Sequence, residues 1–150
     1  MHSPFSILRF QVAFASIWML WMTAHAAILY WYDFTIRAAL TDSVVSNILL
    51  LLACVAVSNN LRYFLPSQKK YSYLFWLCFF MTVLWFFVSR FLIMLLLEES
   101  FEYVHFFSLS VPVRVMFGFF IIGIAGLSSV LWYNLQNQQE AERRKKEAEN

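Results

Sequence analysis

Glycine, proline and cysteine are scarce in this chain, whose 150 residues include three glycines, three prolines and two cysteines. The sequence contains no GxGxxG, no GxxxxGKS/T, no GxSxG and no HExxH, so the common nucleotide-binding, hydrolase and zinc-protease motifs are excluded. Cys54 and Cys78 lie inside apolar runs and form no CxxC pair, so we expect small packing residues, with no disulfide and no metal or redox role. No catalytic residue and no cofactor are expected in these 150 residues.

Charged residues are also few, at 13%, whereas 61% of the residues are hydrophobic and 20% are aromatic. The mean hydropathy is +0.63. This composition is typical of a multi-pass membrane protein and excludes an ordinary soluble domain. The expected partner is therefore the lipid bilayer, and no nucleic acid is expected.

Four apolar segments are long enough to cross a membrane. They run from about Phe10 to Tyr32, from behind Thr41 and Asp42 to about Asn59, from about Tyr71 to Leu97, and from about Pro112 to Tyr133. Continuous apolar runs of about 20 residues favour helices, because barrel strands are about 10 residues long and alternate in polarity. We predict an all-α fold, a four-helix transmembrane bundle over residues 1–133. Thr41 or Asp42 would cap the second helix, and Pro112 would lie in the first turn of the fourth.

Basic residues are concentrated before the first span, between the second and third spans, and after the fourth span. They are Arg9, then Arg62, Lys69 and Lys70, then Arg143, Arg144, Lys145 and Lys146. The other two connections are poor in lysine and arginine, so the positive-inside rule predicts cytoplasmic N- and C-termini. Ala24-His25-Ala26 imitates a signal-peptide cleavage site, but the apolar run continues to Tyr32 and we expect an uncleaved first span.

One polar residue from each span falls at a similar depth in the outer half of the membrane: His25, Asn47, Arg90 and Arg114. Such groups cost a few kcal/mol in hydrocarbon unless they face protein or water. We therefore take these four as candidate ligand-sensing residues around a pocket for an anionic or carbonyl-bearing ligand, with Arg90 as the main charge. The alternative is structural: Arg90 contacts Glu98 or a backbone carbonyl, and the other side chains hydrogen-bond between helices.

A second candidate set comprises Glu98, Glu102 and His105, which a helix would align on one face. Two carboxylates and an imidazole could bind a divalent cation, although acidic residues in a connection are more often simply solvated.

Small residues are concentrated in the fourth span. They are Gly118, Gly123, Ala125, Gly126 and Ser129. They allow close helix packing, either within the bundle or across a dimer interface.

Residues 134–150 are rich in charge and follow the fourth span without a glycine or proline. Glu140 with Arg144, and Glu142 with Lys146, are spaced to form ion pairs on a helix. We predict that the fourth helix extends into a cytoplasmic coiled-coil-like stalk, the start of a signalling coiled coil. A solvated charged helix is the alternative.

The four spans, the connection NNLRYFLPSQKKYSY (59–73) and the passage into LQNQQEAERRKKEAEN (135–150) resemble the membrane-bound sensor histidine kinases of the LytS/YehU type, particularly four-span Bacteroidetes members. The resemblance implies the membrane input portion of a two-component system in the bacterial inner membrane. It also implies a homodimer and a response regulator as partner, with ATP and Mg belonging to a kinase core absent from this chain. His2, His25 and His105 do not match the phosphoacceptor context.

Two other functions fit the same composition. One is a small stand-alone transporter or pore, with Arg90 and His25 along its path, and the other is a membrane adaptor that docks a soluble partner through its charged tail.

Overall fold

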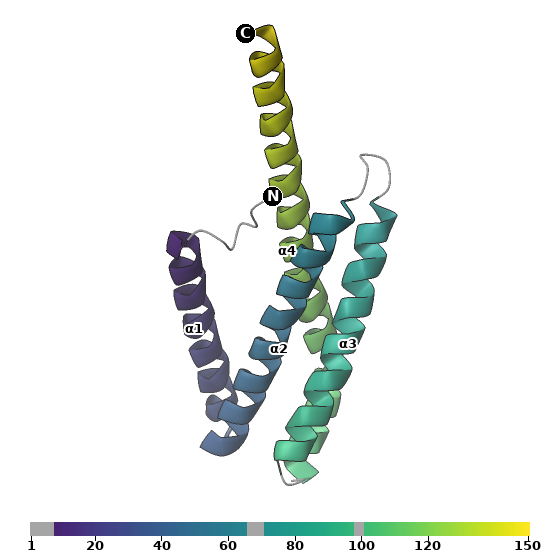
Figure 1. Cartoon of the computed structure of the whole chain (residues 1–150). Coiled ribbons are helices and arrows are strands. Elements are labelled where there is room, and N and C mark those ends of the chain that lie inside the picture. The colour runs from purple at the N-terminus through teal and green to yellow at the C-terminus, as the bar shows by residue number, and fades with distance from the viewer. Residues whose placement is uncertain (1–7, 66–70, 98–100) are drawn as a thin grey trace.

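The computed structural model describes residues 8–65, 71–97 and 101–150 (Figure 1). Within these ranges the chain is helical and has no strand. The helices are α1 (Leu8–Trp31), α2 (Ile36–Tyr63), α3 (Ser72–Leu96) and α4 (Phe101–Glu149). All four are long and apolar enough to cross a membrane. The predicted four-helix transmembrane fold is therefore confirmed.

Successive helices run in opposite directions, and α2, α3 and α4 pack against one another. By contrast, α1 packs mainly on α2 and diverges from the bundle toward its own N-terminus (Figure 1). Leu29, near the end of α1, is the one residue of this helix that is fully buried within the described chain. Burial within α1 is therefore greatest near the α1–α2 turn.

A tight turn joins α1 to α2. Asp33 adopts a left-handed backbone with φ of 63°, a conformation that aspartate tolerates better than most residues. Thr35 then caps α2, because its hydroxyl accepts a hydrogen bond from the Ala38 N–H at 3.2 Å. The predicted cap at Thr41 or Asp42 was wrong. Both residues lie inside α2, which begins earlier than its purely apolar stretch.

The fourth helix continues far beyond its predicted apolar span. It has 49 residues, and Pro112 lies in its interior, so the prediction that Pro112 marks the first turn was wrong. A proline removes one backbone donor, which a packed transmembrane helix tolerates. At about 1.5 Å per residue, α4 is about 73 Å long, against about 30 Å of hydrocarbon.

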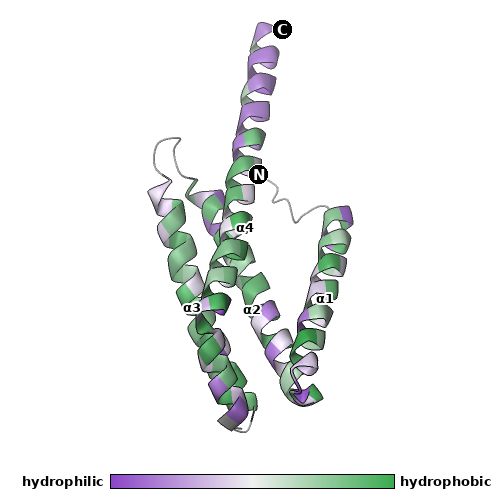
Figure 2. Ribbon diagram, turned by 180° about the vertical axis from the view of Figure 1, so that it is seen from behind, coloured by the Kyte–Doolittle hydropathy of each residue, from purple (hydrophilic) through white to green (hydrophobic). Residues whose placement is uncertain are grey.

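The C-terminal part of α4 is polar and projects beyond the other helices (Figure 2). Every residue from 137 onward is exposed. Arg143 and Glu147 form an ion pair at 3.3 Å there, in place of the predicted pairs with Arg144 and Lys146. We refer to residues 134–150 as the stalk.

The glycines of α4 differ in what surrounds them. A Cβ at Gly118 would overlap the indole of Trp85, and one at Gly126 would lie 3.0 Å from Leu74. Gly123 faces open space. Ser129 is buried and donates to the Ala125 carbonyl at 2.7 Å. Gly118, Gly126 and Ser129 therefore serve packing within one chain.

Candidate functional site: a polar centre and its cavity

An ion pair inside the bundle joins α2 to α4. Nη1 of Arg114 donates to Oδ1 of Asp42 at 2.8 Å, and Nη2 donates to Oδ2 at 2.5 Å. The side chain of Asp42 is fully buried and that of Arg114 is 12% exposed. Two parallel N–H···O bonds between opposite charges are among the stronger polar contacts in proteins.

Neighbouring side chains complete the hydrogen bonding of this pair. The Tyr103 hydroxyl donates to Oδ2 of Asp42 at 2.8 Å, and the Ser46 hydroxyl donates to Oδ1 at 3.0 Å. With the two bonds from Arg114, the carboxylate accepts four hydrogen bonds, which is about its full capacity. Nε of Arg114 also donates to the Ser110 hydroxyl at 2.8 Å. These five residues form what we call the polar centre.

Helical spacing explains why these residues meet. Asp42 and Ser46 are four residues apart, so they lie on one face of α2. Tyr103, Ser110 and Arg114, with Phe107 between them, follow steps of four, three and four along one face of α4. The Phe107 ring lies 4.5 Å from the guanidinium carbon and covers one side of the charge.

Asn47 fastens α1 to the bundle. Its Oδ1 accepts a hydrogen bond from the Trp21 indole at 3.1 Å, and its backbone carbonyl accepts one from Trp18 at 3.3 Å. Its Nδ2 donates to the Ser43 carbonyl at 2.7 Å and lies 3.0 Å from Nδ1 of His25. The adjacent Ser43 hydroxyl donates to the Met22 carbonyl at 2.6 Å.

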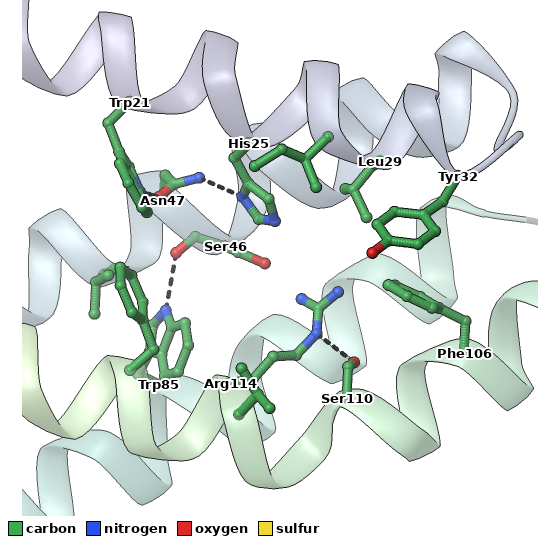
Figure 3. Close-up of a pocket in the computed structure, with 14 residues that line it drawn as sticks. Trp21, His25, Leu29, Tyr32, Ser46, Asn47, Trp85, Phe106, Ser110 and Arg114 are labelled. Atoms are coloured by element: carbon green, nitrogen blue, oxygen red, sulfur yellow. Dashed lines mark hydrogen bonds between the residues drawn. The ribbon is translucent and has the colours of Figure 1, made fainter.

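These contacts fix the tautomer of His25. An indole N–H can only donate and a carbonyl can only accept, so the Trp21 and Ser43 partners set the orientation of the Asn47 amide. Its Nδ2 must then donate to Nδ1 of His25, which places the imidazole hydrogen on Nε2. Figure 3 shows this second nitrogen turned toward the Tyr32 hydroxyl and the Arg114 guanidinium.

A cavity of about 260 Å³ lies beside the polar centre, between α1, α2 and α4, with Trp85 of α3 in its wall. Its lining is mainly apolar and aromatic. The polar lining residues are His25, Ser46, Asn47, Ser110 and Arg114, and the aromatic ones are Trp21, Tyr32, Trp85, Phe106 and Phe117. Mostly apolar walls with a few converging polar groups are typical of small-molecule sites.

The structure brings three of the four candidate ligand-sensing residues together: His25, Asn47 and Arg114 all line the cavity. Arg90 does not, since it lies on the exposed surface of α3. Its neighbour Ser89 is buried, and a helix turns by about 100° per residue, so the next side chain points elsewhere. The charge at the cavity is Arg114. The polar group that α3 supplies is Trp85, whose indole donates to the Ser46 carbonyl at 2.9 Å.

The candidate metal ligands lie elsewhere. Glu98 is outside the described residues, and Glu102 and His105 are both exposed on α4. Across residues 8–65, 71–97 and 101–150, no group of three His, Cys, Asp or Glu side chains is close enough to hold a metal ion.

Asp42 and Tyr103 were not among the candidate site residues. Asp42 was assigned to a helix end because it precedes the apolar run, and Tyr103 lies before the expected fourth span. The sequence feature that could have identified Asp42 is its spacing of four residues from Ser46, which places both side chains on one face of a helix. This spacing is informative only once α2 is known to begin at Ile36, so that both residues lie inside it.

Fold and site together define the class of this chain: a multi-pass helical membrane protein with a polar centre in its bundle and a last helix that projects beyond it. No protein-family model, curated protein or solved structure significantly matches the chain.

Proposed function

We propose that this chain is the membrane input portion of a two-component sensor histidine kinase. In this proposal α4 carries a signal from the cavity to a kinase core joined after Asn150. One observation carries the proposal: a single continuous helix both lines the cavity, through residues such as Arg114 and Phe117, and forms the exposed charged stalk.

The placement of charge supports the proposed orientation. The cavity is lined by residues close to the α1–α2 turn, such as Ile28, Leu29 and Tyr32. That turn lies at the end of the bundle opposite the one from which the stalk projects (Figure 1). The stalk carries four basic residues, Arg9 lies in the first turn of α1 and Arg62 in the last turn of α2. The start of α1 and the end of α2 lie toward the end of the bundle from which the stalk projects. The positive-inside rule therefore supports a cytoplasmic stalk and N-terminus, with the cavity in the outer half of the bacterial inner membrane.

Signalling requires two states that a stimulus distinguishes. Filling the cavity would change how α1 and α4 pack around it, because both helices supply its walls. In a homodimer, a displaced α4 moves relative to its copy, and a continuous helix transmits that displacement to the kinase core. ATP and Mg would bind that core, and a response regulator would receive the phosphoryl group.

Autophosphorylation of the full-length protein in lipid nanodiscs tests the proposal. Inserting Gly-Gly after Leu135 should abolish its dependence on the stimulus, because glycine lowers helix stability in the exposed stalk. A seven-residue helical insertion at the same point preserves both stiffness and heptad phase, so it should retain regulation. Regulation that survives the Gly-Gly insertion, or a native continuation without a histidine kinase core, contradicts the proposal. Ion flux through the reconstituted chain would favour a pore instead.

A further inference from the structure

We propose that the cavity binds a neutral, lipid-soluble ring compound that carries carbonyl oxygens, the chemistry of a membrane quinone. The inference deepens the proposed sensor function and rests on it for its consequence, since the ring compound would be the stimulus. Four properties of the cavity support it: the balance of charge, the free hydrogen-bond donors, the aromatic walls and the position next to the lipid-facing surface.

The polar centre offers no net charge to attract an anion. The guanidinium of Arg114 is already paired with the Asp42 carboxylate through two hydrogen bonds. A second anion would lie next to the buried carboxylate, where like charges repel strongly because the dielectric constant is low. A cation would meet the same guanidinium. The favoured ligand is therefore neutral.

The remaining polar groups are mainly donors. Nε2 of His25 carries a hydrogen, and Arg114 uses three of its five N–H groups on Asp42 and Ser110, which leaves two. The side chains of His25, Arg114 and Tyr32 point toward one another (Figure 3). The acceptor oxygens of Asp42 are fully used. A ligand that satisfies this site brings acceptors, and a carbonyl oxygen is such an acceptor.

The walls suit a flat ring. The rings of Trp21 and Phe117 are stacked with centroids 5.2 Å apart and an interplanar angle of 13°, and both line the cavity. Trp85 and Phe106 add two further aromatic surfaces. Aromatic side chains pack favourably against another ring in stacked or edge-on geometry.

Part of the cavity wall also faces the outside of the bundle. Ile28 and Val113 line it and are 55% and 70% exposed, on helix faces within candidate membrane spans. A volume of about 260 Å³ accommodates a ring headgroup, while an attached alkyl chain would remain in the bilayer. A membrane-soluble compound can therefore enter without crossing water.

Quenching of tryptophan fluorescence tests the ligand class, because Trp21 and Trp85 line the cavity. The full-length protein in nanodiscs is titrated with decylubiquinone, which quenches indole fluorescence, and decylbenzene, without carbonyls, and decyl sulfate, an anion, are then added as non-quenching competitors. We expect saturable quenching by decylubiquinone that neither competitor reverses. His25→Phe keeps an aromatic ring but loses the donor, so binding should weaken about fivefold. Arg90→Gln, outside the cavity, is the matched control and should bind normally.

A second measurement uses the unmodified protein, so its result does not depend on whether a variant folds. A diazirine-bearing decylubiquinone should label peptides that contain Ile28 and Val113 in the unmodified protein, and excess decylubiquinone should suppress the labelling. Displacement of decylubiquinone by decyl sulfate, no saturable quenching, or labelling spread over all four helices overturns the inference.

Autophosphorylation, measured in parallel, separates this inference from the proposed function. Saturable quinone binding that leaves autophosphorylation unchanged supports the ligand class and contradicts the sensor function. Autophosphorylation that responds to a different membrane change, without quinone binding, overturns the ligand class and leaves the sensor function standing.

Discussion

Asp42 and Arg114 lie 72 positions apart in the sequence and are joined by two hydrogen bonds inside the bundle. This pair connects the first half of α2 to the cavity-lining part of α4. The same guanidinium contacts Ser110 and the Phe107 ring of its own helix, and these contacts orient it toward Asp42.

Breaking this pair should strongly destabilise the bundle. Asp42→Asn keeps the shape of the side chain but leaves the Arg114 charge without its partner, so we expect the free energy of unfolding to fall by about 3–5 kcal/mol. The double variant Asp42→Leu/Arg114→Met should be more stable than either single change, because it removes both charges. Unfolding in detergent micelles, followed by circular dichroism, measures this. Arg90→Gln, on the exposed surface, is the control and should change stability by less than about 0.5 kcal/mol.

Removing the Asn47 side-chain amide should loosen α1. Asn47→Leu has a similar size but deletes the hydrogen bonds to Trp21, His25 and the Ser43 carbonyl. Leaving buried partners unsatisfied costs about 1–3 kcal/mol. Amide hydrogen exchange should accelerate in α1 and remain slow in α3.

The matched control for that variant is Asn60→Leu. Asn60 lies at the other end of α2, where it accepts a hydrogen bond from the Tyr73 hydroxyl at 2.6 Å, and its replacement should leave α1 unchanged. If both variants expose α1 equally, Asn47 is not the residue that fastens it.

The glycines of α4 should respond differently to a methyl group. Gly118→Ala should destabilise the protein by about 1–3 kcal/mol, because the new Cβ would overlap the Trp85 indole. Gly123→Ala faces open space and should be neutral or stabilising by up to about 1 kcal/mol, since alanine favours the helix. Thermal unfolding of the two variants side by side measures the difference, and equal midpoints would refute the close Gly118–Trp85 contact.

Tyr133 should anchor the base of the stalk. Its ring is fully buried and its hydroxyl donates to the Ser58 carbonyl at 3.1 Å, so Tyr133→Phe should cost about 0.5–1.5 kcal/mol. We expect faster hydrogen exchange around residues 130–136. Tyr63→Phe alters a residue that is 76% exposed and should change nothing measurable.

Hydropathy predicted the helix bounds more accurately where an apolar run stops sharply at polar residues. The expected first and third spans agree with α1 and α3 to within two residues. The expected second span was too short, because a polar residue such as Asp42 resembles the end of a helix. In the structure Asp42 lies inside α2, where the Arg114 guanidinium neutralises its charge. The fourth began too late because Pro112 resembles a first-turn residue, whereas α4 continues through it.

The site was only partly predictable for a similar reason. Polar residues within apolar runs marked His25, Asn47 and Arg114, and these line the cavity. Arg90 lies outside the cavity because of the rotation of α3 about its own axis, and a single sequence does not specify that rotation. The partner of Arg114 could not be deduced, because a pairing across 72 positions depends on how α2 and α4 pack.

Pro112 lies two residues before Arg114, at the level of the cavity, and lacks the N–H that would tie it to the preceding turn. From this weak point the remainder of α4 extends for about 55 Å. A tilt of about 5° over that length would displace the far tip sideways by about 5 Å. Tyr133, which lies between the proline and the tip, is fully buried against α2, so such a tilt would also have to shift its contact with Ser58.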